Sequence, residues 1–248
     1  MSYQNRLLNR LRRAQANVCF CTLAIHAPYR QRAKLLIKDA PTVSWIVLTD
    51  EPTDFAELPA HVIRHEPTGP MAIDFLTRDL PPTGNGRGLP AYHDKRFVLE
   101  AALQDFNTAI FVDADTRIIQ QPKIPRFKSG IAVVRELRAS ITEHLSRWGA
   151  HRLPAFENLA QNLTGDVQVL ESARWCSEAL FAVTKDGNES RFFEGWARSV
   201  EILQSQNMFS GEGGVIGLAA QYAGWTVDYN SLDRLAAAIE HEGHGPKQ

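Results

Sequence analysis

The stretch TAIFVDADTRII, from Thr108 to Ile119, is the segment of this sequence that most clearly indicates its fold. Its first residues are mostly apolar, and two aspartates separated by one alanine follow them. The apolar run predicts a buried strand, and alternation along an extended chain places Asp113 and Asp115 on the same side of it. Two carboxylates this close repel each other and resist burial, so we expect a positive group to lie between them.

The composition is that of an ordinary soluble globular protein. The chain has 248 residues, of which 44% are hydrophobic and 22% charged, and we expect residues 1–248 to form a single domain. A formal net charge of −1 gives no field that would favour nucleic acid as a partner. Three cysteines form no disulfide framework, and we expect Cys19 and Cys21 to be small buried residues on one face of a strand.

The sequence predicts no transmembrane segment, because no apolar run approaches the roughly 18–20 residues that span a bilayer. The run VCFCTLAI follows basic residues as in a signal peptide, but it is short and contains a threonine. We therefore expect a first strand there and a cytoplasmic protein. Residues 1–15 predict a basic amphipathic helix, which either docks on the domain or touches anionic lipid at the inner face of a membrane.

Strands and helices alternate along most of the chain, which predicts an α/β fold with a central, mostly parallel sheet flanked by helices. The expected strands are 17–25, 43–51, 61–66, 108–118, 129–137, 175–187 and 225–230. The expected helices are 30–40, 92–106, 189–206 and 211–224, with irregular helical structure in 136–165. Residues 66–90 are rich in proline and glycine and predict a functional or mobile loop.

The acidic pair predicts a site for a divalent cation and a diphosphate. In open α/β sheets, ligands bind beyond the carboxyl ends of the strands, and Asp113 and Asp115 stand at such an end. Carboxylate oxygens suit Mg²⁺ or Mn²⁺, which share their coordination between a few carboxylates, waters and phosphates. The cation and the diphosphate would neutralise the pair.

Two enzyme classes place Asp-x-Asp after an apolar strand. Haloacid-dehalogenase-like phosphatases carry Asp-x-Asp-x-Thr, usually on the first strand, whereas here Arg117 takes the threonine position and the motif falls mid-chain. Nucleotide-sugar transferases of the GT-A fold, which is Rossmann-like, have several strands before the motif. The segment KRFVLEAALQDFNTAIFVDADTRI resembles the basic helix and the metal-binding strand of those transferases.

Three further segments resemble retaining GT-A transferases of the glycogenin-like and blood-group types. RWCSEALFAV resembles the strand that lines the acceptor side, and SGEGGVIGLAAQYAGW resembles the acidic turn and its helix. The tail HEGHGPK is similar to the glycogenin-like His-x-x-Gly-x-x-Lys. His241 and Lys247 keep that spacing, but His244 stands in the middle, so either histidine is a candidate metal ligand.

The resemblance implies a role for each candidate residue. Asp113 and Asp115, with His241 or His244, would hold Mn²⁺ or Mg²⁺, and Lys247 would meet the diphosphate of a nucleotide-sugar donor, expected to be a UDP-sugar. Lys95 and Arg96 begin the helix before the motif, and Arg96 is the one that the resemblance favours as a phosphate ligand. The first strand and its loop would contact the base or the ribose through Thr22, Ala24 and Tyr29.

Glu212 and Glu178 are the two candidate catalytic carboxylates. Glu212 stands just before a helix, where the helix dipole keeps a carboxylate ionised, so it either caps the helix or deprotonates an acceptor hydroxyl. Glu178 is predicted near the acceptor side. Trp175 and Trp225 either stack on a sugar or pack in the core.

The leading hypothesis is a divalent-metal-dependent glycosyltransferase that moves a sugar from a nucleotide sugar to a hydroxyl acceptor. The acceptor would be a saccharide or another hydroxyl compound, with a glycan and a lipid-linked glycan among the candidates. One alternative is a phosphatase that uses Asp113 as its nucleophile. Another is a non-catalytic protein that binds nucleotide sugars.

Overall fold

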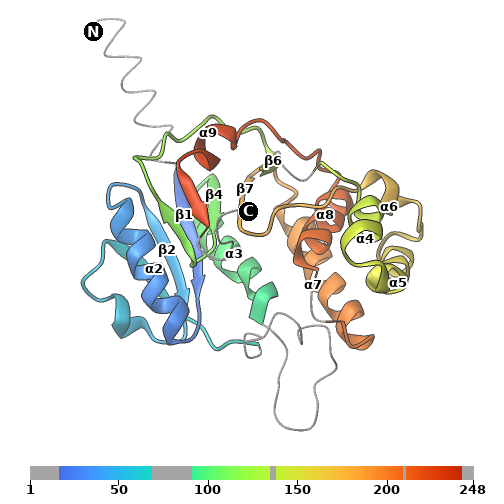
Figure 1. Ribbon diagram of the computed structural model, residues 1–248, viewed down its shortest axis with the longest axis horizontal. Coiled ribbons are helices and arrows are strands. Elements are labelled where there is room, and N and C mark those ends of the chain that lie inside the picture. The colour runs from blue at the N-terminus through green and yellow to red at the C-terminus, as the bar shows by residue number, and fades with distance from the viewer. Residues whose placement is uncertain (1–16, 69–90, 135–137, 209–210, 242–248) are drawn as a thin grey trace, which may run out of the picture.

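A computed structural model of the chain describes residues 17–68, 91–134, 138–208 and 211–241 (Figure 1). Its centre is a six-stranded sheet with the strand order β3-β2-β1-β4-β7-β6. These strands are β1 (Val18–Ala24), β2 (Trp45–Thr49), β3 (Ala60–Arg64), β4 (Thr108–Val112), β6 (Gly130–Val133) and β7 (Leu180–Thr184). Neighbours among β1 to β4 are parallel, whereas β7 is antiparallel to β4 and β6. The predicted α/β class with a mostly parallel central sheet is confirmed.

Both faces of the sheet are covered, which explains why its strands read as continuous apolar runs. Helix α2 (Ala27–Asp39) packs on the face that contains Phe20, and helix α3 (Lys95–Asp105) packs on the opposite face. Cys19 and Cys21 are both buried on the α3 face, as the alternation along the strand predicted. Short 3₁₀ helices η1 (Pro52–Phe55) and η2 (Ala91–Asp94) precede β3 and α3.

A helical region follows β6 and packs beside the sheet (Figure 1). Its elements are α4 (Ile141–Trp148), η4 (Ala150–Arg152), α5 (Leu153–Thr164), α6 (Val169–Ser172), α7 (Glu189–Ser205) and α8 (Glu212–Tyr222), with β7 between α6 and α7. Ser140 begins α4 with a capping box, in which it exchanges hydrogen bonds with Glu143. Within the described ranges, no helix combines the length and the apolar character needed to cross a bilayer.

A second, two-stranded sheet joins the region of the aspartates to the end of the described chain. β5 (Thr116–Ile118) pairs with β8 (Ile239–His241), which follows the short helix α9 (Asp233–Ala236). The predicted strand at 225–230 is wrong. A single bridge joins Asp228 to Ala132, and the Asp228 carboxylate then accepts hydrogen bonds from the backbone N–H groups of Asn230 and Ser231, which turn the chain.

Candidate functional site

Asp113 and Asp115 lie where the connections within the sheet reverse direction. β1 leads through α2 to β2 on one side, whereas β4 lies on the other side of β1. Open α/β sheets bind ligands at the carboxyl ends of the strands at such a point. The backbone N–H of Asp113 donates to the Ala179 carbonyl at 2.9 Å, and the Asp113 carbonyl accepts from the Thr116 N–H at 3.1 Å. These bonds fix the turn that carries both carboxylates.

Lys95 places a positive charge beside Asp113. Its Nζ atom lies 3.0 Å from Asp113 Oδ1, donates to the Glu178 carbonyl at 3.1 Å, and lies 4.0 Å from Glu212 Oε1. Burial lowers the pKa of Lys95, but the carboxylates of Asp113, Glu212 and Glu178 outweigh burial and raise this pKa above its ordinary value. Lys95 is therefore a charged, buried clamp on Asp113.

The ion pair between Arg32 and Asp115 is longer than the one between Lys95 and Asp113, and its cation is more exposed. The Arg32 Nη1 atom lies 3.9 Å from Asp115 Oδ2, and the Arg32 side chain is 45% exposed. Tyr29, also in α2, is half-buried nearby, and its pKa is raised by burial and then by the Asp115 charge. Burial raises the pKa of Asp113 too, with Lys95 opposing the rise and Asp115 adding to it. Each aspartate thus faces a cation from a different helix.

Glu212 and Glu178 are held together by close backbone packing at the start of α8. Glu212 is the first residue of that helix and is 4% exposed. A Cβ atom at Gly213 would lie 2.6 Å from Glu178 Oε2, and still closer to the Trp175 indole nitrogen and the Cys176 carbonyl oxygen. Because that space is filled, a side chain at Gly213 would push α8 away from the segment that carries Glu178.

Three consecutive polar residues before and at the start of α3 are buried, which is unusual outside a site. Lys95 forms the clamp described above. Asp94 accepts hydrogen bonds from His65 Nε2 at 2.9 Å and from the Thr68 N–H at 2.9 Å, which ties α3 to the chain after β3. His93 Nδ1 accepts from the Trp196 indole N–H of α7 at 3.2 Å. Residues 93–95 therefore connect the start of α3 to α7, to the chain after β3 and to the acidic pair after β4.

The structure brings some predicted residues together and leaves others apart. Thr22 and Ala24 are fully buried within β1, so their side chains lie beneath the surface. The Arg96 guanidinium lies over the Phe97 ring at 4.3 Å and is no part of the Lys95 clamp. The backbone of His241 pairs with Thr116, close to Asp115 in the chain. His244 and Lys247 lie outside the described residues, as do residues 69–90 and the predicted N-terminal helix.

The resemblance favours Arg96 over Lys95 as the phosphate ligand, and it assigns no role to His93. A usable signal for Lys95 was present, because Val98, Leu99 and Ala102 form the buried stripe of α3 and Lys95 lies three and four positions before its first members. Sequence gave no comparable signal for His93, since its partner Trp196 comes from a helix 103 residues further along the chain.

Of the two alternatives for Trp175 and Trp225, sugar stacking and core packing, the structure shows core packing. Trp175 is 3% exposed and stacks on His144 at 3.8 Å between ring centres, and burial lowers the pKa of His144 to about 4. Trp225 is 7% exposed and stacks on Phe192 at 4.8 Å. Their rings are therefore already covered by other side chains.

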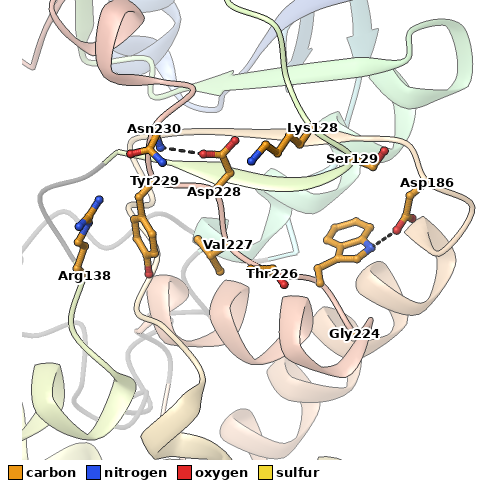
Figure 2. A pocket seen from close by; sticks show the side chains of 11 residues that line it. Lys128, Ser129, Arg138, Asp186, Gly224, Thr226, Val227, Asp228, Tyr229 and Asn230 are labelled. Carbon is orange, nitrogen blue, oxygen red and sulfur yellow. Dashed lines mark hydrogen bonds between the residues drawn. The ribbon is translucent and has the colours of Figure 1, made fainter.

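A cavity of about 410 Å³ lies beside β6 and is separate from the acidic pair (Figure 2). Its lining combines charged, hydroxyl, amide and aromatic side chains: Lys128, Ser129, Arg138, Asp186, Gly224, Trp225, Thr226, Val227, Asp228, Tyr229 and Asn230. The two carboxylates in it already accept internal hydrogen bonds, Asp186 from the Trp225 indole at 2.7 Å and Asp228 from the Asn230 N–H at 2.8 Å. This lining holds the 224–230 segment in place.

Comparisons with known proteins assign no family to the chain. No model of a known protein family matches it, and no curated protein matches it in sequence. Among solved structures, the chain is similar to a crystal structure of mouse xyloside xylosyltransferase 1 in its apo form. The identity is 9%, the TM-score is 0.44, and the match covers 85% of this chain and 83% of that chain. At this identity and TM-score, the likeness assigns neither a family nor a reaction.

Proposed function

We propose that this chain is a divalent-metal-dependent glycosyltransferase that moves a sugar from a nucleotide-sugar donor to a hydroxyl acceptor. One observation carries the proposal. Asp113 and Asp115 lie at the carboxyl end of β4, where the connections within the sheet reverse direction. Lys95 of α3 forms an ion pair with Asp113, and Arg32 of α2 forms one with Asp115. This is where open α/β sheets bind nucleotides, and the residue types are those that meet a cation and a diphosphate.

The residues present fit a divalent cation in their chemistry. Asp113 and Asp115 offer hard carboxylate oxygens from one turn, which suits Mn²⁺ or Mg²⁺ in a site completed by waters and phosphates. Among the described side chains, no group of three or more histidine, cysteine, aspartate or glutamate residues converges on one point. A further ligand would come from the diphosphate or from His241 or His244, and β8 leads that part of the chain to Thr116.

Asp113, Asp115 and Lys95 would have different roles around the bound donor. A bound divalent ion supplies Lewis-acid stabilisation of charge on a departing diphosphate. Lys95 orients Asp113 and favours its ionised form, because the Lys95 charge opposes the rise in the Asp113 pKa that burial causes. The ion pair of Asp115 with Arg32, at 3.9 Å and with a 45% exposed cation, is easier to displace than the pair of Asp113 with Lys95.

The acceptor side would be formed by Glu178 and Glu212. Both approach Lys95, Glu178 through its backbone carbonyl and Glu212 through its carboxylate. The close packing at Gly213 fixes one relative to the other. A sugar hydroxyl placed here would meet carboxylate acceptors held in place before it binds, which is how sites reduce the cost of reorganisation. We propose a UDP-sugar as donor and a saccharide as acceptor, with Lys247 on the diphosphate.

The test combines ligand-induced thermal stabilisation with a transfer assay. Wild-type protein is mixed with UDP, UDP-glucose, UDP-galactose or UDP-xylose, with and without Mn²⁺. We expect stabilisation that requires the metal. Asp115→Asn removes one anionic ligand and should abolish that stabilisation and lower sugar transfer or donor hydrolysis by roughly a hundredfold or more. Asp105→Asn, at the exposed far end of α3, is the matched control and should behave as wild type.

The same assay separates the alternatives. A phosphatase with Asp113 as nucleophile would form an aspartyl-phosphate and would not depend on a nucleotide sugar. A non-catalytic binding protein would show metal-dependent stabilisation without turnover of any donor. Wild-type activity in Asp115→Asn, or no stabilisation by any nucleotide with Mn²⁺, would overturn the proposal.

A further inference from the structure

The cavity beside β6 contains a buried hydroxyl group that has no hydrogen-bond partner. The Oη atom of Tyr229 is buried, and within the described residues it neither donates nor accepts a hydrogen bond. Buried polar atoms without a partner are rare in folded proteins, and a missing ion or ligand is one explanation for them. Burial raises the pKa of Tyr229 to about 12, so the phenol keeps its proton at neutral pH and can donate a hydrogen bond.

The two carboxylates in this cavity already have donors within the chain. Asp186 accepts from the Trp225 indole at Oδ2 and from the Asn188 N–H at Oδ1. Asp228 accepts from the N–H two residues later at Oδ1 and from the Ser231 hydroxyl at Oδ2. Because all four carboxylate oxygens accept a hydrogen bond internally, the carboxylates are engaged with the fold rather than left for a ligand.

The two cations in the cavity lack comparable partners. Neither the Lys128 ammonium nor the Arg138 guanidinium forms an ion pair or a hydrogen bond with a residue that the structure describes. The Arg138 guanidinium instead lies over the Tyr229 ring, 5.5 Å from its centre, so a cation and the unpartnered hydroxyl belong to the same part of the lining. The Arg174 guanidinium donates to the Arg138 carbonyl at 3.5 Å, which adds a third positive charge nearby.

The charge that this cavity favours in a ligand is therefore negative. Figure 2 shows the groups in question on three segments: Lys128 precedes β6, Arg138 follows it, and Tyr229 follows α8. Ammonium, guanidinium and phenol groups all donate hydrogen bonds, whereas phosphate and carboxylate oxygens accept them. Hydrogen bonds between such charged partners are shorter and stronger than those between neutral groups.

The rest of the lining suits the hydroxyl groups of a sugar. The cavity volume, about 410 Å³, is within the usual range for small-molecule sites and exceeds what a single phosphate or carboxylate fills. Ser129, Thr226 and Asn230 line the same space, and hydroxyl and amide groups both donate and accept, as sugar hydroxyls do. An anionic group joined to a sugar therefore matches both parts of the lining.

We propose that this cavity binds an anionic saccharide, whose phosphate or carboxylate contacts Arg138 and Lys128 and accepts the hydrogen bond of the Tyr229 hydroxyl. This assignment goes beyond the proposed function, because it places a second ligand away from the acidic pair. It does not depend on whether Asp113 and Asp115 hold a metal.

Tyr229→Phe separates a ligand contact from a role in folding. Phenylalanine keeps the ring beneath Arg138 and removes only the hydroxyl that has no partner. Without ligand, the variant should be at least as stable as wild type, because no internal hydrogen bond is lost. With ligand, it should bind more weakly than wild type. A hydroxyl that serves the fold alone predicts the opposite pattern.

The two cations are tested by Arg138→Met and Lys128→Met, which remove the charge but keep a long side chain. Both residues are exposed, so the variants should fold as wild type does. Lys123→Met is the matched control, because Lys123 is also an exposed lysine between β5 and β6 but is not part of the lining.

Calorimetry of the full chain at fixed ionic strength measures the binding of glucose 1-phosphate, glucose 6-phosphate, glucuronate, glucose and inorganic phosphate. EDTA is present throughout, so metal-dependent binding at the acidic pair does not contribute. We expect a charged sugar to bind more tightly than glucose or phosphate alone, and the comparison of the sugar phosphates with glucuronate identifies the anionic group. Tyr229→Phe, Arg138→Met and Lys128→Met should each weaken that binding roughly tenfold or more, and Lys123→Met should leave it unchanged.

Four results would overturn the inference. One is that the charged sugars bind wild type no more tightly than glucose does. Another is an equal loss in Lys123→Met and Lys128→Met, which would reflect general surface charge. A third is wild-type affinity in Tyr229→Phe, and the fourth is loss of binding in Asp115→Asn, which would place the sugar at the acidic pair. Metal-dependent binding of UDP-sugars is measured separately, so failure here and failure of the proposed function are distinguishable.

Discussion

The sheet has two parts, which we call the parallel half (β3, β2, β1 and β4) and the antiparallel half (β7 and β6). The two parts position the residues of the candidate site in different ways. In the parallel half, α2 and α3 follow or precede their strands directly, and their side chains reach the acidic pair: Arg32 meets Asp115 and Lys95 meets Asp113. In the antiparallel half, Glu178 and Glu212 depend on where α8 packs against the segment before β7.

The two halves of the sheet should tolerate different kinds of substitution. A charge on a helix next to its strand is placed by local geometry, so it survives modest changes elsewhere. A carboxylate placed by close contact of two backbones needs glycine at the contact and fails when any atom is added there. The parallel half should therefore be most sensitive to changes of charge, and the antiparallel half to changes of volume.

The largest effect is expected from Lys95→Met, which tests the sensitivity to charge. Methionine fills a similar volume but leaves Asp113 and Glu212, both close to Lys95 Nζ, without this cation. Breaking a buried ion pair from one side costs about 3–5 kcal/mol of unfolding free energy. Urea unfolding measures the loss. Arg96→Met is the matched control, because its guanidinium lies over Phe97 at 4.3 Å, and it should cost less than about 1 kcal/mol.

Equal stability of Lys95→Met and Arg96→Met would mean that the clamp contributes nothing beyond the helix itself. The comparison between the halves would then fail on its parallel side. A loss confined to Lys95→Met would also explain why the adjacent basic residues of one helix are not interchangeable.

The architecture of the parallel half could be predicted from the sequence to a large extent. Apolar runs followed by helical patterns predicted β1, α2, β2, α3 and β4, and the Asp-x-Asp end of β4 predicted where the acidic pair would lie. Burial on both faces of a parallel strand leaves an apolar signature that depends on local residues alone. Which basic residue meets Asp113 also had a local signal, in the buried stripe of α3.

The next largest effect is expected from Gly217→Ala, which tests the sensitivity to volume. A Cβ atom at Gly217 would overlap the Arg174 carbonyl oxygen, a backbone atom that cannot rotate away. Overpacking of this kind costs about 2–3 kcal/mol. Gly224→Ala is the matched control: no atom lies within 4 Å of its Cβ position, and its φ of 76° costs an alanine about 1 kcal/mol. Thermal and urea unfolding should rank Gly217→Ala as the less stable variant.

The antiparallel half could be predicted only in part, because its decisive contacts join residues far apart in the chain. The glycines of α8 are visible in the sequence, but their meaning depends on Trp175, Cys176 and Arg174, which lie on a different segment. The predicted strand at 225–230 failed for the same reason. Its alternation is strand-like, yet Asp228 forms one bridge and then turns the chain.

The smallest effect is expected where the two-stranded sheet joins the parallel half, through Asp39 and Arg117. Arg117 Nε donates to Asp39 Oδ2 at 2.6 Å, and the Ile118 N–H donates to the same oxygen at 3.1 Å. The hydrogen bond from Arg117 lowers the pKa of Asp39 in the folded protein. The pairing therefore stabilises the folded state above the ordinary pKa of about 3.9, and this stabilisation is lost as pH falls through the lower folded-state pKa.

Asp39→Asn should accordingly lower the unfolding free energy by about 1 kcal/mol at pH 7, because Arg117 is partly exposed and solvent screens the pair. The difference from wild type should shrink as the pH is lowered below about 3.9, because Asp39 of the unfolded chain is protonated first and Asp39 of the folded protein at lower pH. Urea unfolding at neutral and acidic pH measures both values, with Asp105→Asn as the exposed control. A difference that stays constant across this pH range would show that Asp39 acts through packing alone, and that β5 is held to α2 without the help of charge.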